Sequence, residues 1–391
     1  MSFNIYLLGK NSFIAKNLYL KLKPLYTNIF LLSHTEIDKM FPTSNDIIIN
    51  CCGVNRSKVF EDYDKGNYIH VKKIIDNLKK TNVFFIHISS LMVHGFQNKE
   101  ISDLSEYQQW FITTKFKGEE YIQDNYQNYC IIRPSNVYGY SCKPYYNNLL
   151  STMVYEKIKG YKRINKLNQN CIRNMISIDG LCNELLKIIK EKRKGIFDIV
   201  SNNDLDLKNL CLILYNNEKP CHISFEEGDV DIPNKIFNQI IVEENLQEEI
   251  LKLEQRMKNY IYLKENIIIT QLNTLSQSRG DMVEISNLQS KRLYKITLNK
   301  HSVRGNHFHY QQVEEFYNNR GQVTYILSKS DDVNTMLLLH TNENTKINIQ
   351  PYIVHTVVND FISNIPEIVI SSTQEYVPNS APDTKYINLI I

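Results

Sequence analysis

The chain has 391 residues, enough for two domains that each bury a hydrophobic core. Its formal net charge is +3 and it has no long basic run, which argues against a nucleic-acid groove or a basic membrane-binding patch. No apolar stretch approaches the roughly 18 residues of a membrane span, no signal pattern begins the chain, and the cysteines form no Cys-x-x-Cys pair. We therefore expect a cytoplasmic protein.

The N-terminal segment has the pattern of a dinucleotide-binding strand, turn and helix. Residues 4–8 form a short β-rich run that ends at Gly9, and helical apolar spacing follows. The glycine fingerprint is incomplete, because Ser12 and Ala15 replace its second and third glycines. Taken alone, the motif does not separate a cofactor site from an ordinary strand-helix turn. If it binds cofactor, the contacts fall on Gly9, Ser12, Phe13 and Ile14.

Further buried strands at residues 29–32, 46–50 and 83–88 alternate with helical segments, which predicts a parallel Rossmann-like α/β sheet. No acidic residue closes the second strand, where Ser33 follows Leu32. A carboxylate there would bind the ribose 2′-hydroxyl of NAD, so its absence favours NADPH while leaving NADH possible. Cys52 and Gly53 end the next strand and are further candidates for cofactor contact.

Two stretches resemble the active-site motifs of extended short-chain dehydrogenases. The first is Ser89-Ser90-Leu-Met-Val-His-Gly95, and the second is Lys115 followed by Gly118-Glu119. The resemblance implies that Ser90 and Lys115 are catalytic and that Lys115 also binds the cofactor.

Two arginine motifs extend this resemblance. Residues 133–139 read Arg-Pro-Ser-Asn-Val-Tyr-Gly, a stretch that lies beside nicotinamide and substrate in that family. Arg173 begins an Arg-x2-Ile-x2-Asp pattern, in which the family's arginine grips the pyrophosphate of a nucleotide sugar through its fork of donors. The resemblance thus implies cofactor contact by Arg133 and substrate contact by Asn136 and Arg173.

One position departs from these motifs. The family's catalytic tyrosine stands four residues before the lysine, where this chain has Phe111. Loss of a positioned general acid typically costs about 10²- to 10⁴-fold in rate. Tyr107 is the best substitute because it lies two helical turns before Lys115, and Tyr138, Ser90 or a water held by Ser90 and Lys115 are the other possibilities.

The C-terminal third carries a pattern of metal ligands. His307 and His309 are spaced to share one face of a strand, Glu314 can return to that face across a bend, and His355 lies about forty residues further on. Imidazole and carboxylate suit Zn, Fe(II), Ni or Mn, and we expect Zn. The alternative is an exposed strand with unrelated histidines. With Gly321, these residues resemble the two signature motifs of the cupin barrel, although the second motif lacks its usual glycine and is one residue short.

Both halves together resemble the CapF (WbjC) family of capsular-polysaccharide enzymes, which combine an extended short-chain dehydrogenase with a cupin. The resemblance rests on Cys52–Arg56, Gly66–Asn67, Cys142–Asn147 and Asn379–Thr384 as well as the domain order, and covers nearly the whole chain. It implies a UDP-linked 2-acetamido-4-keto-6-deoxyhexose substrate that the cupin epimerises at C3 and the dehydrogenase reduces at C4 with NADPH. It also implies substrate contacts by Asn55, Arg56, Lys143 and Asn147.

We therefore expect a Rossmann-like dehydrogenase domain over residues 1–262 and an all-β cupin (jelly-roll) barrel over residues 263–391, forming a homodimer by analogy. Tyr317 or Tyr325 is a candidate proton donor in the cupin, against a default of core packing. Two alternatives to the bifunctional enzyme stay open. One is an epimerase whose dehydrogenase half only binds, and the other is a protein that binds nucleotide sugar without turnover.

Overall fold

The computed structural model describes residues 3–94, 104–161, 166–168, 172–215, 224–226, 238–273, 275–277, 280–282, 290–362, 365–374 and 383–387. The chain divides into two compact units, Met1–Leu25 with Leu31–Met257 and Tyr26–Phe30 with Lys258–Ile391. The boundary expected at residue 262 lies inside one continuous helix, α9 (Leu246–Asn266). No helix in the described ranges is long and apolar enough to cross a membrane.

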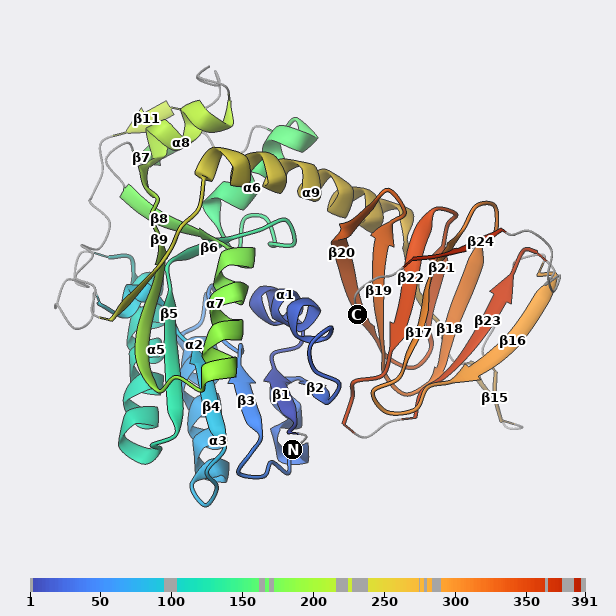
Figure 1. Ribbon diagram of the computed structural model, residues 1–391, viewed down its shortest axis with the longest axis horizontal. Coiled ribbons are helices and arrows are strands. Elements are labelled where there is room, and N and C mark those ends of the chain that lie inside the picture. The colour runs from blue at the N-terminus through green and yellow to red at the C-terminus, as the bar shows by residue number, and fades with distance from the viewer. Residues whose placement is uncertain are drawn as a thin grey trace. The chain divides into compact units, whose positions relative to one another are not determined.

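The first unit is built on a seven-stranded sheet in the order β12-β9-β5-β4-β3-β1-β2 (Figure 1). The pairings of β1 with β3, β3 with β4, β4 with β5, β5 with β9 and β9 with β12 are all parallel. Its central strands are buried on both faces, which explains their uninterrupted apolar sequence. The strands are β1 (Ile5–Leu8), β2 (Ile29–Leu32), β3 (Ile47–Asn50), β4 (Phe84–Ile88), β5 (Tyr129–Pro134), β9 (Gly195–Ser201) and β12 (Gln239–Val242).

Helices connect these strands and contact one another in pairs. Helix α1 (Phe13–Leu22) contacts α7 (Ile178–Glu191), and α3 (His70–Leu78) contacts α5 (Glu106–Asn125). The strand order reverses between β1 and β3, and in open α/β sheets ligands bind at the carboxyl ends of the strands beside such a reversal. The remaining described elements of this unit are η1 (His34–Lys39), α2 (Phe60–Tyr63), η2 (Asp64–Ile69), η3 (Leu91–Val93), β6 (Asn136–Tyr138), α6 (Leu149–Lys159), β7 (Lys166–Asn168), β8 (Ile172–Ser177), β10 (Asp204–Asp206), α8 (Leu207–Leu214) and β11 (Ser224–Glu226).

The second unit consists mainly of two five-stranded antiparallel sheets (Figure 1). One sheet has the order β13-β21-β18-β23-β16 and the other β20-β19-β22-β17-β24. Their strands are β13 (Ile268–Gln271), β16 (Arg292–Thr297), β17 (Val303–His309), β18 (Glu314–Arg320), β19 (Val323–Lys329), β20 (Asp332–Thr341), β21 (Thr345–Ile349), β22 (Ile353–Val358), β23 (Glu367–Ser372) and β24 (Thr384–Tyr386). Beside them, β14 (Leu275–Gln277) pairs with β15 (Gly280–Met282). The predicted fold class, a Rossmann-like domain followed by a cupin-like all-β domain, is confirmed.

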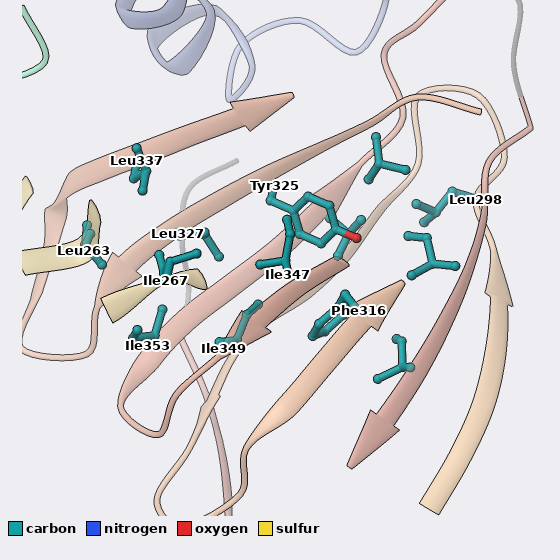
Figure 2. Packing of buried hydrophobic residues seen from close by; sticks show 14 residues of the cluster. Leu263, Ile267, Leu298, Phe316, Tyr325, Leu327, Leu337, Ile347, Ile349 and Ile353 are labelled. Atoms are coloured by element: carbon teal, nitrogen blue, oxygen red, sulfur yellow. The ribbon is translucent and has the colours of Figure 1, made fainter. Parts of the chain in front are cut away.

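Apolar side chains from both sheets of the second unit form its core. Phe316 and Ile347 come from one sheet, Tyr325 and Leu327 come from the other, and Figure 2 shows them gathered in one cluster. Tyr325 is fully buried there, and burial raises the pKa of its phenol far above the usual range. Its hydroxyl has no hydrogen-bond partner among the described residues.

A buried hydroxyl without a partner loses the hydrogen bonds that it makes with water in the unfolded chain. We therefore expect Tyr325→Phe to leave the free energy of unfolding unchanged or to raise it by about 1 kcal/mol. Tyr317→Phe is the matched control, because the Tyr317 hydroxyl donates to Asn344 Oδ1 at 2.8 Å, and its loss should cost about 1 kcal/mol. Thermal unfolding followed by circular dichroism measures both, and equal destabilisation by the two variants would contradict the prediction.

Candidate metal centre and cofactor-binding edge

The two histidine-bearing strands of the second unit approach each other closely. Strand β17 pairs with β22 so that His307 lies opposite His355, and a register shift falls between Gly305 and His307. Gly305 has a φ of +106°, and a Cβ atom there would lie 2.4 Å from the carbonyl oxygen of His355. Only glycine combines this backbone conformation with this approach. Glycine at this position therefore allows the two imidazoles to face each other.

The four predicted ligands meet at one point. Nitrogen and carboxylate atoms of His307, His309, Glu314 and His355 all lie within 4.8 Å of one another. His355 Nε2 is 3.1 Å from His307 Nε2 and 3.2 Å from Glu314 Oε2, while His309 Nε2 is 3.5 Å from the same oxygen. Ligands about 2.0–2.1 Å from a tetrahedral Zn²⁺ are separated by about 3.3 Å, so this donor set fits one such ion.

The electrostatics of the cluster favour the protonation states that bind metal. Burial alone would raise the pKa of Glu314, but the adjacent imidazoles of His309 and His355 lower it far below its usual range. Burial, together with the neighbouring His355, lowers the pKa of His307 to about 4. A carboxylate and a neutral imidazole are the forms that coordinate a cation. The cluster is therefore arranged for coordination at neutral pH.

The shortened second motif is accommodated by an unusual backbone conformation. Tyr352 follows Pro351 and has a φ of +63°, in the left-handed region that glycine usually occupies. Its amide donates to the carbonyl oxygen of His309 at 2.8 Å, which ties the start of β22 to the end of β17. The turn before β22 therefore forms even though the usual glycine of the motif is missing.

Two tyrosines that were not expected lie against the cluster. The hydroxyl of Tyr294 donates to Glu314 Oε1 at 3.3 Å, and the ring centroid of Tyr386 is 5.3 Å from that of His307. The two expected candidates have other contacts, since Tyr317 donates to Asn344 and Tyr325 lies in the core. The alternating pattern of residues 292–297 predicts that the Tyr294 side chain points inward. That pattern cannot identify Glu314 as its hydrogen-bond partner.

At the carboxyl edge of the first sheet, the predicted cofactor turn is tightly packed. Gly9 has a φ of +83°, and a Cβ there would lie 3.0 Å from backbone atoms of Cys51 and Cys52. Ser12 caps helix α1, because its side chain accepts from the amide of Ala15 at 3.1 Å. Phe13 and Ile14 follow in the first turn of that helix, half-buried. The helix N-terminus therefore lies at the edge where a pyrophosphate binds in this fold.

Lys115 is buried at the same edge. Its Nζ donates to the carbonyl oxygen of Ile88 at 3.1 Å and lies 2.9 Å from where a Cβ of Gly53 would be. Burial lowers the pKa of Lys115 to about 8. Asn67 holds the neighbouring loop, since its side chain bonds both the amide and the carbonyl of Val54. Gly53 and Lys115 are thus brought together as expected for one site.

The positions around the missing tyrosine do not supply an evident replacement. Ser90 is half-buried and caps the short helix η3 (Leu91–Val93), accepting from the amide of Met92 at 3.3 Å. Phe111 is half-buried, whereas Tyr107 is 48% exposed and its ring contacts Trp110 at 5.4 Å. Tyr138 is fully buried, and burial with the nearby Glu244 raises the pKa of its phenol far above the usual range. Gly95, the last residue of the serine motif, lies outside the described residues.

A carboxylate from the helix that follows the second strand lies beside the end of that strand. Glu36 lies in the short helix η1 (His34–Lys39) and folds back in a capping box, accepting from the Ser33 amide at 2.9 Å. It also accepts from Lys10 Nζ at 3.2 Å. Although burial alone would raise it, the Ser33 amide and the Lys10 ammonium lower the pKa of Glu36 to about 2. The Ser-x-x-Glu spacing was the available signal in the sequence.

Arg133 is engaged inside the protein. Its guanidinium, 5% exposed, donates from Nε to both carboxylate oxygens of Glu119 at 3.1 Å, and its Nη1 is 4.0 Å from Asp198 Oδ1. His94 Nε2 lies 2.8 Å from the other oxygen of Asp198. The guanidinium is therefore paired with carboxylates inside the unit, near the end of β5. The cofactor contact expected for Arg133 therefore stays a prediction.

The expected substrate-binding residues fall in three places of the first unit. Exposed Arg56, two residues after Val54, donates to the carbonyl oxygen of Tyr145 at 3.2 Å, while Asn147 Oδ1 accepts from the Lys143 amide at 2.8 Å. The structure thus joins Arg56 to the loop that carries Lys143 and Asn147. Asn55 is exposed and precedes Arg56 in the chain. Asn136 donates to the carbonyl oxygen of Asn174, and Arg173 is half-buried on β8.

Residues 4–198 match the family model described as the RmlD substrate binding domain. No curated protein sequence matches the chain. The chain is similar to the capsular polysaccharide assembling protein CapF from Staphylococcus aureus, with 17% identity, a TM-score of 0.43, and coverage of 98% of this chain and 99% of that one. A dTDP-4-dehydrorhamnose reductase from Bacillus anthracis in complex with NADP is 16% identical, with a TM-score of 0.49 and coverage of 65% and 99%. The family match falls on the part of the chain that carries most strands of the seven-stranded sheet.

The Lys10–Glu36 pair predicts how the chain distinguishes its cofactors. In this fold the end of the second strand faces the adenosine ribose, so Glu36 would repel a 2′-phosphate and Lys10 would attract it. We expect Glu36→Gln to raise the affinity for NADPH relative to NADH by about tenfold, the effect of removing one charge a few ångströms away. Fluorescence titration with each cofactor measures the ratio.

Two further variants control this experiment. Lys10→Met should shift the ratio in the opposite direction. Asp38→Asn, on the same short helix and paired with Lys73, should leave it unchanged. An unchanged ratio in Glu36→Gln would show that the carboxylate does not face the ribose.

Proposed function

We propose that this chain is a nucleotide-sugar enzyme that epimerises C3 of a UDP-2-acetamido-2,6-dideoxy-4-hexulose in its cupin unit and reduces the C4 ketone with NADPH in its dehydrogenase unit. The product would be a UDP-N-acetyl-6-deoxy-L-hexosamine for a surface glycan. The observation that carries the proposal is the convergence of His307, His309, Glu314 and His355 on one point. The family match of residues 4–198 and the resemblance to the CapF family support the substrate class.

The proposed epimerisation uses the acidity of the carbon next to a ketone. A C4 carbonyl acidifies the C3 hydrogen, so a base can remove that proton and an acid can return one to the opposite face. A divalent ion held by the four ligands would orient the substrate or polarise the ketone as a Lewis acid. Tyr386 lies beside His307 and is largely exposed, which makes its phenol a candidate for proton transfer. Tyr294 would hold Glu314 in place.

In the proposed reduction, NADPH would deliver hydride to C4 and the resulting alkoxide would take up a proton. The buried Lys115 ammonium would stabilise the developing negative charge, and Ser90 would hydrogen-bond the carbonyl oxygen. Phe111 cannot supply the proton that a tyrosine at this position would donate. Ser90 itself and a water held by Ser90 and Lys115 are the remaining donors that need no movement of Tyr107 or Tyr138.

Phe111 also favours a second candidate function. With Tyr107 exposed against Trp110 and Tyr138 buried, the dehydrogenase unit could bind nucleotide sugar and leave the ketone intact. The chain would then be an epimerase alone. A third candidate, a binding protein without turnover, would bind the substrate and form no product. The resemblance further supports a cytoplasmic homodimer.

One experiment separates these functions. Metal-loaded protein is incubated with a UDP-4-keto-6-deoxy-N-acetylhexosamine in D₂O without cofactor, and deuterium at C3 is measured by mass spectrometry. A second sample with NADPH is followed at about 340 nm, the nicotinamide absorbance whose loss reports hydride transfer. We expect deuterium uptake that disappears after chelation of the metal and, with NADPH, oxidation of the cofactor. Deuterium uptake without NADPH oxidation would mean that the chain is an epimerase alone. The absence of both signals would overturn the proposal that the chain is an enzyme.

Restoring the tyrosine tests the dehydrogenase unit directly. We expect Phe111→Tyr to raise the rate of NADPH oxidation by about 10²-fold or more, since a positioned general acid contributes that much. Deuterium exchange at C3 should stay the same in this variant. Phe116→Tyr, on the same helix, is the control for adding a phenol elsewhere on α5. An unchanged oxidation rate in Phe111→Tyr would show that the protonation step is already supplied or that no hydride transfer occurs.

A further inference from the structure

We propose that Asp383 and Thr384, at the start of the C-terminal strand β24, are positioning residues that hold His309 in the orientation required for metal binding. The inference rests on the metal centre of the proposed function. It states that two residues more than seventy positions after His309 in the sequence contact that ligand and hold it in place. Residues 379–382 of the terminal motif noted in the sequence lie outside the described residues. Asp383 and Thr384 of the same motif are described.

Strand β24 lies directly against the strand that carries two of the ligands. It pairs antiparallel with β17, so that Thr384 lies opposite His309 and Tyr386 opposite His307. Beyond the ladder, the Tyr310 amide donates to the Asp383 carbonyl oxygen at 2.9 Å. These backbone bonds fix the position of residues 383 and 384 relative to His309.

The side chains of β24 then reach the outer nitrogen of His309. Thr384 Oγ1 lies 3.0 Å from His309 Nδ1, and Asp383 Oδ2 lies 3.6 Å from the same nitrogen. An acceptor beside Nδ1 favours the tautomer that carries its proton there, which leaves Nε2 free for a metal. His309 Nε2 indeed faces Glu314 Oε2, at 3.5 Å.

Asp383 also organises the turn that leads from His309 to Glu314. Its two carboxylate oxygens accept from the backbone amides of Gln311 at 2.7 Å and Gln312 at 3.0 Å. Gln312 in turn donates from Nε2 to Glu314 Oε1 at 2.7 Å. One carboxylate is therefore linked to two of the four ligands, directly to His309 and through Gln312 to Glu314.

The other two histidines do not depend on β24 side chains in this way. His355 Nδ1 lies 3.2 Å from the carbonyl oxygen of Ile353, two residues away on its own strand. His307 Nδ1 has no hydrogen-bond partner in the part of the chain that the structure describes. Disturbing residues 383 and 384 should therefore act on His309, and through Gln312 on Glu314, and leave His307 and His355 in place.

The test is Co²⁺ titration of metal-free full-length protein, followed by the visible absorption of the bound ion, for wild type, Asp383→Asn and Thr384→Val. We expect about 10- to 100-fold weaker Co²⁺ binding in each variant, as is usual when the partner of a metal-bound histidine is removed. Asp331→Asn is the matched control, because Asp331 is an exposed aspartate of the same unit paired with Lys329, and it should bind Co²⁺ like the wild type. Thr384→Ser keeps the hydroxyl and should restore most of the affinity lost in Thr384→Val.

The outcomes distinguish this inference from the function on which it rests. Wild-type affinity in both Asp383→Asn and Thr384→Val would overturn the positioning role and leave the metal centre standing. No Co²⁺ binding by the wild type would overturn the metal centre and this inference with it. Circular dichroism of the metal-free variants reports folding, and if Asp383→Asn does not fold, the comparison of Thr384→Val with Thr384→Ser decides the result.

Discussion

The close approach of β17 and β22 is the constraint on which the metal centre depends. At Gly305 the two backbones are so near that any side chain would collide with the His355 carbonyl, and the positive φ there shifts the register of the ladder. That shift places His307 across from His355. Glu314 then enters from the other sheet, so the site joins both layers of the unit. A larger residue at position 305 would separate the strands and move two ligands at once.

The first unit has a similar dependence on close backbone contact. A Cβ at Gly118 would lie 2.6 Å from the carbonyl oxygen of Asn67, so α5 packs directly against η2. Asn67 bonds Val54 on one side and Thr114 on the other. The residue after Thr114 is Lys115, which explains how a buried ammonium is held at the sheet edge. The dehydrogenase frame is thus intact around a position that has lost its hydroxyl.

Under the proposed function, the two units would supply complementary parts of one chemistry. Both sites would act on a ketone, one through a cation that polarises it and the other through the buried Lys115 ammonium that stabilises its alkoxide. Substitution of tyrosine by Phe111 keeps the packing of the ring and removes a proton donor. Under the proposed function, it would separate the binding of a keto sugar from its reduction.

The sequence by itself determined the fold class and identified three of the four residues that converge in the candidate metal centre, because both follow from local period. Continuous apolar runs alternating with helical spacing predict a parallel sheet, and His-x-His with a nearby glutamate places three ligands on one face. It did not reveal that Glu36, four residues after the second strand, returns to the end of that strand through a capping box. Only the tertiary structure decided that Arg133 is paired with Glu119, that Tyr294 contacts Glu314, and that Asp383 contacts His309. Each of these contacts joins separate elements, and a residue's spacing within its own element does not identify a partner brought beside it by folding.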